Sequence, residues 1–546
     1  MGTFDTHEVF NQSPPYEDVD LYGSDVALQD AVKANGVAAP EAVLSAFGRH
    51  WGRAEMFERA RLANEQTPRL KTFDQKGRRR DVVEFHPAYH AFMAESMKAG
   101  LHAMTWRADA TRAPAPAEVA RAVRYYMVAQ VENGHMCPIT MTRAAVAALA
   151  VDPKLAGVLM PKIAAHEYDP RFLPWPEKSS ITLGMGMTEK QGGTDVRANT
   201  TAAVRDGEGY RLTGHKWFMS APMCDAFLVL AQAPDGLTCF LLPRFKPDGQ
   251  INGLRLQRLK DKLGNRSNAS SEVEFTEAYA HRIGAEGAGI RTILEMVQLT
   301  RLDCAIASAG QMRMALAQAV HHARHRTAFQ KKLVDQPLMR TVLADMALDV
   351  EGALAAVMRL CRSFDQSSAN AGEAARARLL TPAIKYWVCK IAPSLTYEAM
   401  ECLGGNGYVE DGLLARLYRE APVNAIWEGS GNVMCLDVLR ALAKDSEAAL
   451  AVLKELAAET QDLPGTSEAV SSIAGILGSA VAESHARFAV ERIALLAAAA
   501  ALRDGAPAWV AESFTRARLA GMRGATYGAA AIGESADKIV DRALPA

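Results

Sequence analysis

The strongest constraint on the fold is a change of hydrophobic periodicity in the middle of the chain. Residues 41–178, and again the residues after Gly289, carry apolar side chains at three- and four-residue spacing, which is typical of amphipathic helices. Between them, residues 181–285 contain short apolar runs separated by turn sequences such as Asp206-Gly207 and Asp235-Gly236, a pattern typical of β-strands. The sequence therefore predicts an α+β protein in which helical regions enclose a small β-domain.

The periodicity also predicts individual elements. Strands are expected over 227–232, 238–242 and 271–275. Before them, the predicted helices cover 41–64, 86–107, 117–131 and 143–165. After them, helices are predicted over 289–336, 338–365, 373–403 and 433–460, followed by two or three alanine-rich helices. Pro382 and Pro393 lie inside the third of these helices and are expected to end or kink it.

These elements divide the 546 residues into five predicted parts. They are an acidic N-terminal arm (1–40), an N-terminal helical domain (41–180), a central β-domain (181–285), a helical bundle (286–445) and a C-terminal helical extension (446–546). The arm contains Pro14-Pro15 and has no sustained period, so it is predicted to be irregular and to be ordered by packing on another part.

Charge is distributed unevenly along the chain. The formal net charge of −1 combines −6 over residues 1–40, +8 over residues 41–440 and −3 over residues 441–546. A near-neutral average excludes a globally basic surface, but it leaves room for a confined basic patch.

The sequence indicates a cytoplasmic protein without a membrane segment. The longest aliphatic run, residues 493–502, is about half the length that spans a bilayer, and the first residues lack the apolar core of a signal peptide. The eight cysteines are scattered without a Cys-x-x-Cys pair, which excludes a zinc ribbon and favours a reducing compartment.

Two motifs of the β-domain suit a cofactor. In Met187-Thr-Glu-Lys-Gln-Gly-Gly-Thr-Asp195, adjacent glycines allow backbone N–H groups to approach an anion, although the pattern taken alone is more typical of a plain turn. In Gly214-His-Lys-Trp-Phe-Met-Ser220, aromatic side chains beside a hydroxyl suit a flat cofactor with a polar edge. The alternative for the second motif is a half-buried strand.

Two further motifs follow in the helical bundle. Gly404-Gly-Asn-Gly-Tyr408 comes after a helix, and a helix C-cap explains it as well as a binding turn does. In Ile426-Trp-Glu-Gly-Ser-Gly431, the carboxylate of Glu428 stands beside an indole, where partial desolvation would suit a general base. An exposed loop carboxylate is the alternative.

The sequence also contains two clusters of basic side chains. His321 and His325 are four residues apart on one predicted helix, but no carboxylate shares their face, so no metal site is predicted. Six arginines lie between residues 487 and 523 without a lysine, and guanidinium groups suit phosphate oxygens. A solvated helix face is the alternative for this second cluster.

Taken together, the order and spacing of the motifs resemble the acyl-CoA dehydrogenase family. The matching series is Thr188–Asp195, Gly214–Ser220, Lys262–Ser267, Arg326–Phe329, Leu403–Tyr408 and Trp427–Ser430, within residues 45–445. The resemblance implies a helical N-terminal domain, a central β-barrel or sandwich and a four-helix bundle, to which this chain adds an extra C-terminal helical domain. It also implies FAD as the cofactor and a homotetramer.

Within that family, the chain resembles the branch linked to the adaptive response to DNA alkylation. The residues that carry this likeness are Glu189–Gly193, Leu259–Ser270 and Ile426–Asn432, together with the acidic arm and the C-terminal extension. It implies a flavoprotein with residual, isovaleryl-CoA-like dehydrogenase activity that binds double-stranded DNA and protects it from alkylation. The substrate is either an acyl-CoA or a small alkylated compound.

The resemblance also assigns roles to individual residues. Glu428 is the expected catalytic base, and Arg301 and Trp427 are expected to contact the substrate. The expected FAD contacts are Met187, Thr188, Gly193, Thr194, Phe218, Met219, Ser220, Arg326, Phe329, Gly404, Gly405, Trp427 and Gly429. Of these, Arg326, Phe329 and the Gly404-Gly405 turn are expected to reach the FAD of a neighbouring subunit. The expected DNA contacts are Arg440, Arg516, Arg518 and Arg523.

One residue departs from the pattern of the family. Trp427 stands where the family commonly has tyrosine, and the larger side chain would crowd the acyl pocket.

Two alternatives compete with this hypothesis. The first alternative is an ordinary catabolic dehydrogenase for short or branched acyl-CoA, without a role on nucleic acid. The second is a non-catalytic scaffold that shields DNA and holds FAD as a structural group.

Overall fold

The computed structural model describes residues 6–37, 39–521, 523–530 and 532–545. The chain divides into two compact units, each assembled from separate stretches of sequence. Unit 1 comprises Met1–Phe57, Ala122–Val131 and Cys304–Ala546, and unit 2 comprises Glu58–Arg121 and Glu132–Asp303. The five-part division expected from the sequence stays a prediction.

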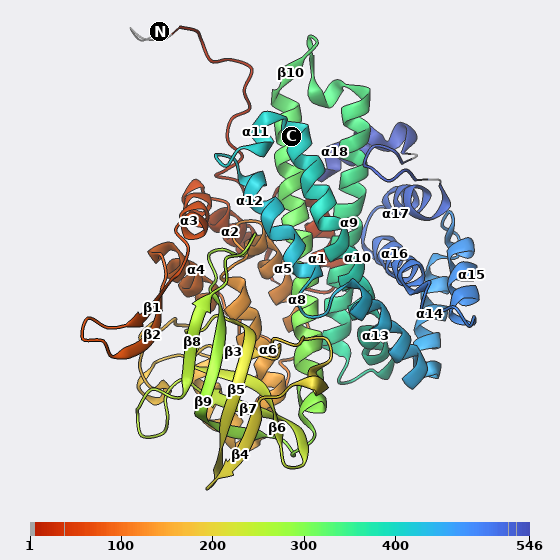
Figure 1. Ribbon diagram of the computed structural model, residues 1–546. Helices are drawn as coiled ribbons and strands as arrows, with labels where there is room; N and C mark the ends of the chain where they lie inside the picture. Colours follow the sequence, from red (N-terminus) through yellow and green to blue (C-terminus); the bar gives the residue numbers. More distant parts are fainter. Residues whose placement is uncertain (1–5, 38, 522, 531, 546) are drawn as a thin grey trace. The chain divides into compact units, whose positions relative to one another are not determined.

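Unit 2 is built around a closed β-sheet (Figure 1). Its strands are β3 (Leu183–Gly186), β4 (Ala202–Asp206), β5 (Gly209–Ser220), β6 (Ala226–Ala233), β7 (Gly236–Pro243), β8 (Leu254–Leu259) and β9 (Ser270–Ile283). The hydrogen-bonded path runs β3-β6-β4-β5-β9-β7, and β7 pairs again with β6, so the sheet returns on itself. This confirms the predicted central β-barrel.

The barrel core explains why the strands form where they do. Strands β6 and β7 pair antiparallel, with Leu228 opposite Leu241, and nearly all their residues are buried. Continuous apolar runs of this kind are stable only where both faces of a strand are covered. Helices α4 (Pro87–Lys98), α6 (Met136–Leu149) and α7 (Pro153–Ile163) belong to the same unit, and α6 packs on β3.

One element of unit 2 was not predicted. Strands β1 (Arg69–Phe73) and β2 (Arg79–Glu84) form an antiparallel ribbon that ends in a turn at Gly77, whose φ is +76°. The helical patterns on either side of this segment gave no sign of it, because its own side chains are mostly charged.

Unit 1 is helical and centres on two long helices, α9 (Pro337–Gln366) and α10 (Ala371–Leu403), which pack on each other and on α16 (Ala486–Gly505). Helix α8 (Gly289–His325) begins in unit 2 and continues into unit 1. Helix α5 (Ala117–Ala129) likewise passes from unit 2 into unit 1. Among the described residues, unit 1 also contains the α-helices α1 (Val26–Ala34), α2 (Glu41–Trp51), α11 (Gly405–Tyr408), α12 (Leu413–Glu420), α13 (Gly431–Lys444), α14 (Ser446–Thr460), α15 (Thr466–Leu477), α17 (Ala508–Thr515) and α18 (Ala536–Ala543).

Several predicted helices are divided in the structure. The expected helix 41–64 becomes α2 and α3 (Ala54–Glu65), since Gly52 is the C-cap that ends α2. Glycine is required at this cap because a Cβ would lie 1.9 Å from the carbonyl oxygen of Val19. Asp152 caps α7, and Asp445 caps α14, so 143–165 and 433–460 are also interrupted. The expected helix 289–336 ends at His325, before the short hairpin β10 (Thr327–Ala328) and β11 (Lys331–Lys332).

The proline prediction was wrong in one respect. Helix α10 runs continuously from Ala371 to Leu403 and contains both Pro382 and Pro393, so neither proline ends it. Long helices that are packed on several sides tolerate the loss of one backbone hydrogen bond at each proline, because their stability comes mainly from tertiary packing.

The N-terminal arm is attached to unit 1 by specific contacts. The Asn11 side chain donates to the carbonyl oxygen of Thr327 (2.8 Å), and Arg326 donates to the carbonyl oxygen of Asn11 (2.6 Å). Its described part is irregular from residue 6 to residue 25 and then forms helix α1, which was not predicted. Among the described residues, no helix has both the length and the apolar character to cross a membrane.

Candidate functional site

The glycine-rich motif forms the loop that follows strand β3. The carbonyl oxygen of Thr188 accepts a hydrogen bond from the Trp217 N–H (2.9 Å), and that of Met187 accepts one from the Asn199 side chain (2.9 Å). The first of these bonds fixes the loop against the end of strand β5. Two motifs that are separate in the sequence therefore lie side by side in unit 2.

Close packing inside this loop requires glycine at position 193. A Cβ at Gly193 would lie 2.3 Å from the Thr188 hydroxyl oxygen, far inside van der Waals contact. Thr194, the next residue, is exposed. The loop thus presents hydroxyl and backbone groups and has no side chain at Gly193. A phosphate-bearing cofactor requires such an arrangement.

A buried ion pair that the sequence did not predict holds the loop against strand β5. The Glu189 carboxylate lies 2.8 Å from the Lys216 ammonium, and both side chains are fully buried. Burial alone raises the pKa of Glu189, but hydrogen bonds from Lys216 and from the 200–201 segment outweigh it and lower the pKa to about 2. The sequence spacing of Glu189 and Lys216 does not predict this ion pair, because the pair joins a loop residue to a strand residue.

The three residues at the end of β5 have different surroundings. Phe218 is 50% exposed, so its ring is available to cover a flat group. Ser220 is partly exposed, and its hydroxyl lies 3.2 Å from that of Ser270. Met219 was expected to contact FAD, but its side chain is fully buried in the barrel, since alternate residues of a strand point to opposite faces. Only its main chain could take part.

Cationic side chains gather beside the two aromatic rings. The Lys260 ammonium lies 3.3 Å from the ring centroid of Trp217 and 4.5 Å from that of Phe218. Lys190 and Arg258 each lie 5.8 Å from the Trp217 centroid. Lys260 and Arg258 are also paired with Glu272 (2.6 and 2.7 Å), so the positive charge beside the rings is partly neutralised within unit 2.

In unit 1, Glu428 occupies a strained turn between η4 (Ala421–Ala425) and helix α13. Its φ of +55° lies in the left-handed region, which is uncommon for a residue with a side chain, and Gly429 follows with a φ of +96°. The Lys385 ammonium donates to the carbonyl oxygens of Trp427 (2.8 Å) and Gly429 (2.7 Å). Lys385 is buried, so the backbone on both sides of Glu428 is held from the bundle interior.

The indole beside Glu428 is also fixed. Its N–H donates to the Asn424 side-chain oxygen (2.9 Å), and the Asn424 amide donates to the Ser308 hydroxyl (3.1 Å). This chain of hydrogen bonds links the Glu428 turn to helix α8. Strained residues that are held by several contacts in this way occur frequently at active sites.

The remaining expected contacts of the cofactor lie on the outside of unit 1. Phe329 is 93% exposed with a φ of +50°, and Arg326 contacts the N-terminal arm. Gly404 ends helix α10 with a φ of +61°, and no atom would meet a Cβ within 4 Å at Gly404 or Gly405. Arg301, the expected substrate contact, lies on α8 in unit 2 and is 9% exposed.

One expected DNA contact is an internal residue. Arg518 is 5% exposed and pairs with Asp345 and Asp349 of helix α9, each at 2.7 Å. Its guanidinium cannot reach a phosphate from there, so its assignment to DNA is corrected. Arg523 also pairs with Asp349 (3.3 Å) but is partly exposed. Arg440 and Arg516 are exposed, and Arg516 pairs with Glu512.

The histidine cluster has other partners. His321 donates to the carbonyl oxygen of Pro14 (2.8 Å), and His325 donates to that of His321 (2.8 Å). No group of three or more potential metal ligands occurs within residues 6–37, 39–521, 523–530 and 532–545.

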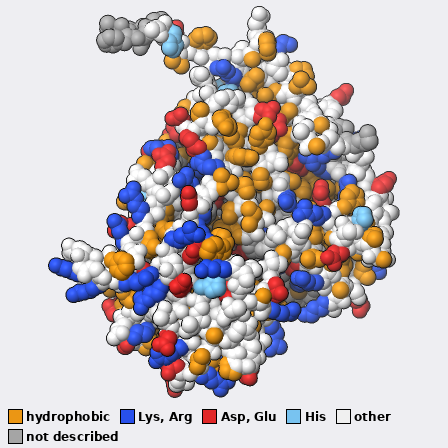
Figure 2. Space-filling model, viewed as in Figure 1, with side chains coloured by type: hydrophobic (Ala, Val, Ile, Leu, Met, Phe, Trp, Pro, Cys, Tyr) orange, Lys and Arg blue, Asp and Glu red, His pale blue; other side chains and the backbone are white. Residues whose placement is uncertain are grey.

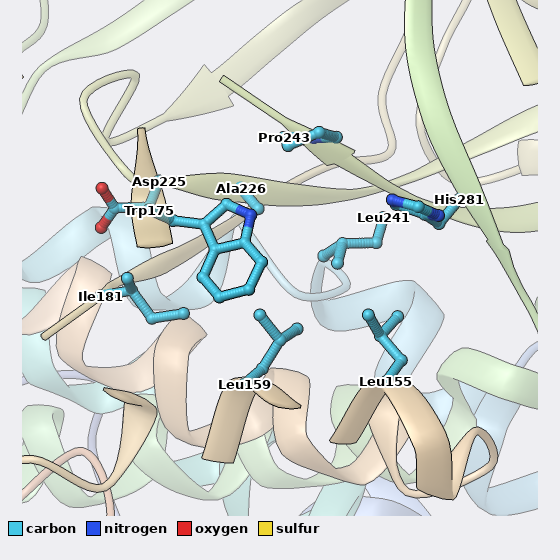
Figure 3. A pocket seen from close by; sticks show the side chains of 9 residues that line it. All are labelled: Leu155, Leu159, Trp175, Ile181, Asp225, Ala226, Leu241, Pro243 and His281. Atoms are coloured by element: carbon cyan, nitrogen blue, oxygen red, sulfur yellow. The ribbon is translucent and has the colours of Figure 1, made fainter. Parts of the chain in front are cut away.

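A small hollow in unit 2 lies apart from these motifs (Figure 3). Leu155 and Leu159 of α7 face Trp175 across it, and His281 stands at one end (Figure 3). The carboxylate at its edge, Asp225, is already paired with Lys178 (2.6 Å). The lining offers apolar contact but no unpaired charge, so we assign it no chemistry.

Three protein families match successive parts of the chain. Residues 11–170 match the adaptive response protein AidB N-terminal domain. Residues 184–278 match the acyl-CoA dehydrogenase middle domain, and residues 287–443 match the acyl-CoA dehydrogenase C-terminal domain.

Individual proteins agree with these matches. The putative acyl-CoA dehydrogenase AidB of Escherichia coli is 51% identical over 443 residues, which cover 81% of each chain. The crystal structure of Caenorhabditis elegans ACDH-11 in complex with C11-CoA superposes with a TM-score of 0.85 at 28% identity, over 100% of this chain and 99% of that one. An acyl-CoA dehydrogenase from Bacillus anthracis, complexed with FAD, shares the fold with a TM-score of 0.64 at 17% identity over 84% of this chain and 79% of that one.

Proposed function

The chain belongs to the acyl-CoA dehydrogenase family, with an N-terminal domain of the AidB type, and on that basis we propose that it is an FAD-dependent oxidoreductase acting on acyl thioesters. The observation that carries the proposal is the turn at Glu428. A carboxylate beside an indole, in a strained backbone conformation fixed by Lys385, is built to meet a substrate in one orientation.

The residues of unit 2 fit FAD. The Gly193 loop offers backbone and hydroxyl donors for a pyrophosphate, Phe218 offers a ring face, and Ser220 offers a hydroxyl. FAD supplies the acceptor for the hydride that leaves the substrate. The proposed contacts are Met187, Thr188, Gly193, Thr194, Phe218 and Ser220, with Trp427, Gly429, Arg326, Phe329, Gly404 and Gly405 from unit 1. The last four would serve a neighbouring subunit in a homotetramer.

In the proposed reaction, Glu428 is the base. Its carboxylate removes the α-proton of the acyl thioester, and Lys385 and the Trp427 indole keep the turn in place while it does so. Arg301 contributes a positive charge near the substrate. Because Trp427 is large, short or branched acyl groups of the isovaleryl type are the preferred substrates, and turnover is slow.

Reduction of the bound flavin tests this proposal directly. Isovaleryl-CoA is added anaerobically to purified protein, and the loss of flavin absorbance is followed. We expect isovaleryl-CoA to bleach the flavin of the wild type and Glu428→Gln to abolish this bleaching. The control is Glu447→Gln, the same substitution at an exposed residue of unit 1, which should leave the bleaching intact. If no acyl-CoA bleaches the wild type, FAD is structural and the dehydrogenase proposal is wrong.

A second proposed function rests on the AidB-type N-terminal domain and the 51% identity to AidB. We propose that the protein associates with double-stranded DNA and protects it from alkylation. Of the expected DNA contacts, Arg440 and Arg516 are exposed and Arg523 is partly exposed. Binding of a labelled duplex should weaken steeply with salt, because Lys and Arg release counterions from phosphates. Binding that is indifferent to salt would contradict this.

A further inference from the structure

The ribbon formed by β1 and β2 in unit 2 carries more positive charge than the sequence on either side of it. Residues 69–80 contain six Lys and Arg and one acid, a net charge of +5 in a chain whose total is −1. In Figure 2 the Lys and Arg side chains gather at the projecting end of this ribbon. Neither the candidate site nor the C-terminal arginines account for it.

Most of this charge is not neutralised within the chain. Lys71 is 3.7 Å from Glu84, and Arg79 is 2.9 Å from the buried Asp81. In the part of the chain that the structure describes, no ion pair is formed by the other four basic residues, which are all exposed: Arg69, Lys76, Arg78 and Arg80. Like charges this close repel one another, so the arrangement costs stability unless a polyanion compensates it.

The ribbon holds its shape without a ligand. The Asp74 carboxylate accepts from the backbone N–H groups of Lys76 (2.8 Å) and Arg78 (3.0 Å), so the single acid is used to close the turn. At the base, the Arg79 guanidinium donates to the carbonyl oxygen of Leu256 on strand β8 (2.9 Å). The unpaired cations are thus presented on a preorganised support.

An aromatic side chain stands among the cations. Phe73 is 58% exposed, opposite Arg79 in the ribbon register. A two-stranded ribbon is one of the two elements that the major groove of duplex DNA admits. The evenly spaced phosphates of a duplex would meet the four unpaired cations.

We propose that the β1–β2 ribbon is a contact site for the phosphate backbone of double-stranded DNA. This inference deepens the proposed association with DNA and depends on it, and it assigns a contact surface outside the C-terminal region. The competing occupant is the acidic N-terminal arm of a second copy, which carries −6 over residues 1–40. In the described chain, however, the arm is already bound to unit 1 through Asn11 and Ser13.

The test compares two variants of the full-length protein with the same change of charge. The ribbon variant is Arg69→Gln/Lys76→Gln/Arg78→Gln. The control is Lys98→Gln/Lys154→Gln/Arg291→Gln, three exposed residues of unit 2 for which no ion pair occurs among the described residues. Fluorescence anisotropy of a labelled 30-base-pair duplex is measured over a series of salt concentrations, and flavin content and the melting temperature confirm folding.

We expect the ribbon variant to lower the slope of log K against log salt by about 2–3, since each lost phosphate contact removes about 0.9. Its affinity at moderate salt should fall about tenfold or more, and the control should match the wild type. A ribbon variant with the wild-type slope overturns the inference and leaves the C-terminal arginines as the proposed contacts. If the wild type itself binds no duplex but binds a peptide of residues 1–25, both the DNA proposal and this site are wrong.

Discussion

The Lys385 ammonium lies 2.8 Å from the carbonyl oxygen of Trp427 and reaches past Glu428 to the carbonyl oxygen of Gly429. One buried cation therefore holds both neighbours of the proposed base, although Lys385 and Glu428 are separated by 43 positions in the sequence. A lysine that bonds only to backbone oxygens does not contact the substrate, so we regard it as a positioning residue for the turn.

Replacing Lys385 with methionine should lower kcat far more than it changes KM. Methionine keeps much of the apolar stem but removes both hydrogen bonds, so Glu428 would leave its fixed orientation, and misplaced catalytic groups cost about 10²-fold. Steady-state kinetics with isovaleryl-CoA measures the split, and flavin content confirms folding. Lys390→Met, an exposed change on the same helix, is the control. Equal losses in both variants would show that Lys385 has no special role.

The Glu189–Lys216 pair should make acid stability depend on Glu189. Because the pKa of Glu189 is lowered to about 2 in the folded state, the pair stabilises the fold above the unfolded pKa, near 4.3. That contribution is lost as pH falls from about 4.5 to 2. We expect Glu189→Gln to flatten this part of the stability profile, as measured by denaturant unfolding at each pH.

A matched pair of variants separates charge from packing at the same site. Glu189→Gln leaves the Lys216 ammonium buried without its partner and should cost about 3–5 kcal/mol at neutral pH. The double variant Glu189→Gln/Lys216→Met removes both charges and should recover part of that loss. A double variant as unstable as the sum of two single variants would contradict a direct interaction.

Strand periodicity, a local signal, predicted the small β-domain, whereas its barrel or sandwich form and the role of Glu428 followed only from the resemblance to the family. The sequence could not predict Lys385 or the Glu189–Lys216 pair, because these contacts join residues that only folding brings together. The burial of Arg518 could not be predicted for the same reason. An arginine in a basic run is expected in solvent, and only the acids of α9 explain its burial.

The correction at Arg518 leads to its own prediction. Arg518→Gln leaves the buried Asp345 without a charged partner and leaves Asp349 with Arg523 alone, and it should destabilise the fold by about 3–5 kcal/mol. Arg516→Gln changes an exposed residue two positions away and should stay within about 0.5 kcal/mol of the wild type. Denaturant unfolding of the two variants provides the comparison. If Arg518→Gln weakened DNA binding at unchanged stability, its structural role would be wrong.

The glycine loop offers a test of cofactor binding that does not depend on turnover. An alanine Cβ at position 193 would lie 2.3 Å from the Thr188 hydroxyl, so the loop must open, and FAD should bind at least about tenfold more weakly.

The matched control is Gly157→Ala, because Gly157 occupies an exposed helix position where a Cβ meets nothing within 4 Å. The dissociation constant of FAD is measured by fluorescence titration of protein stripped of flavin. If Gly193→Ala retained FAD as tightly as Gly157→Ala does, this loop would not be the cofactor site, and the unit 2 half of the proposed function would have to be placed elsewhere.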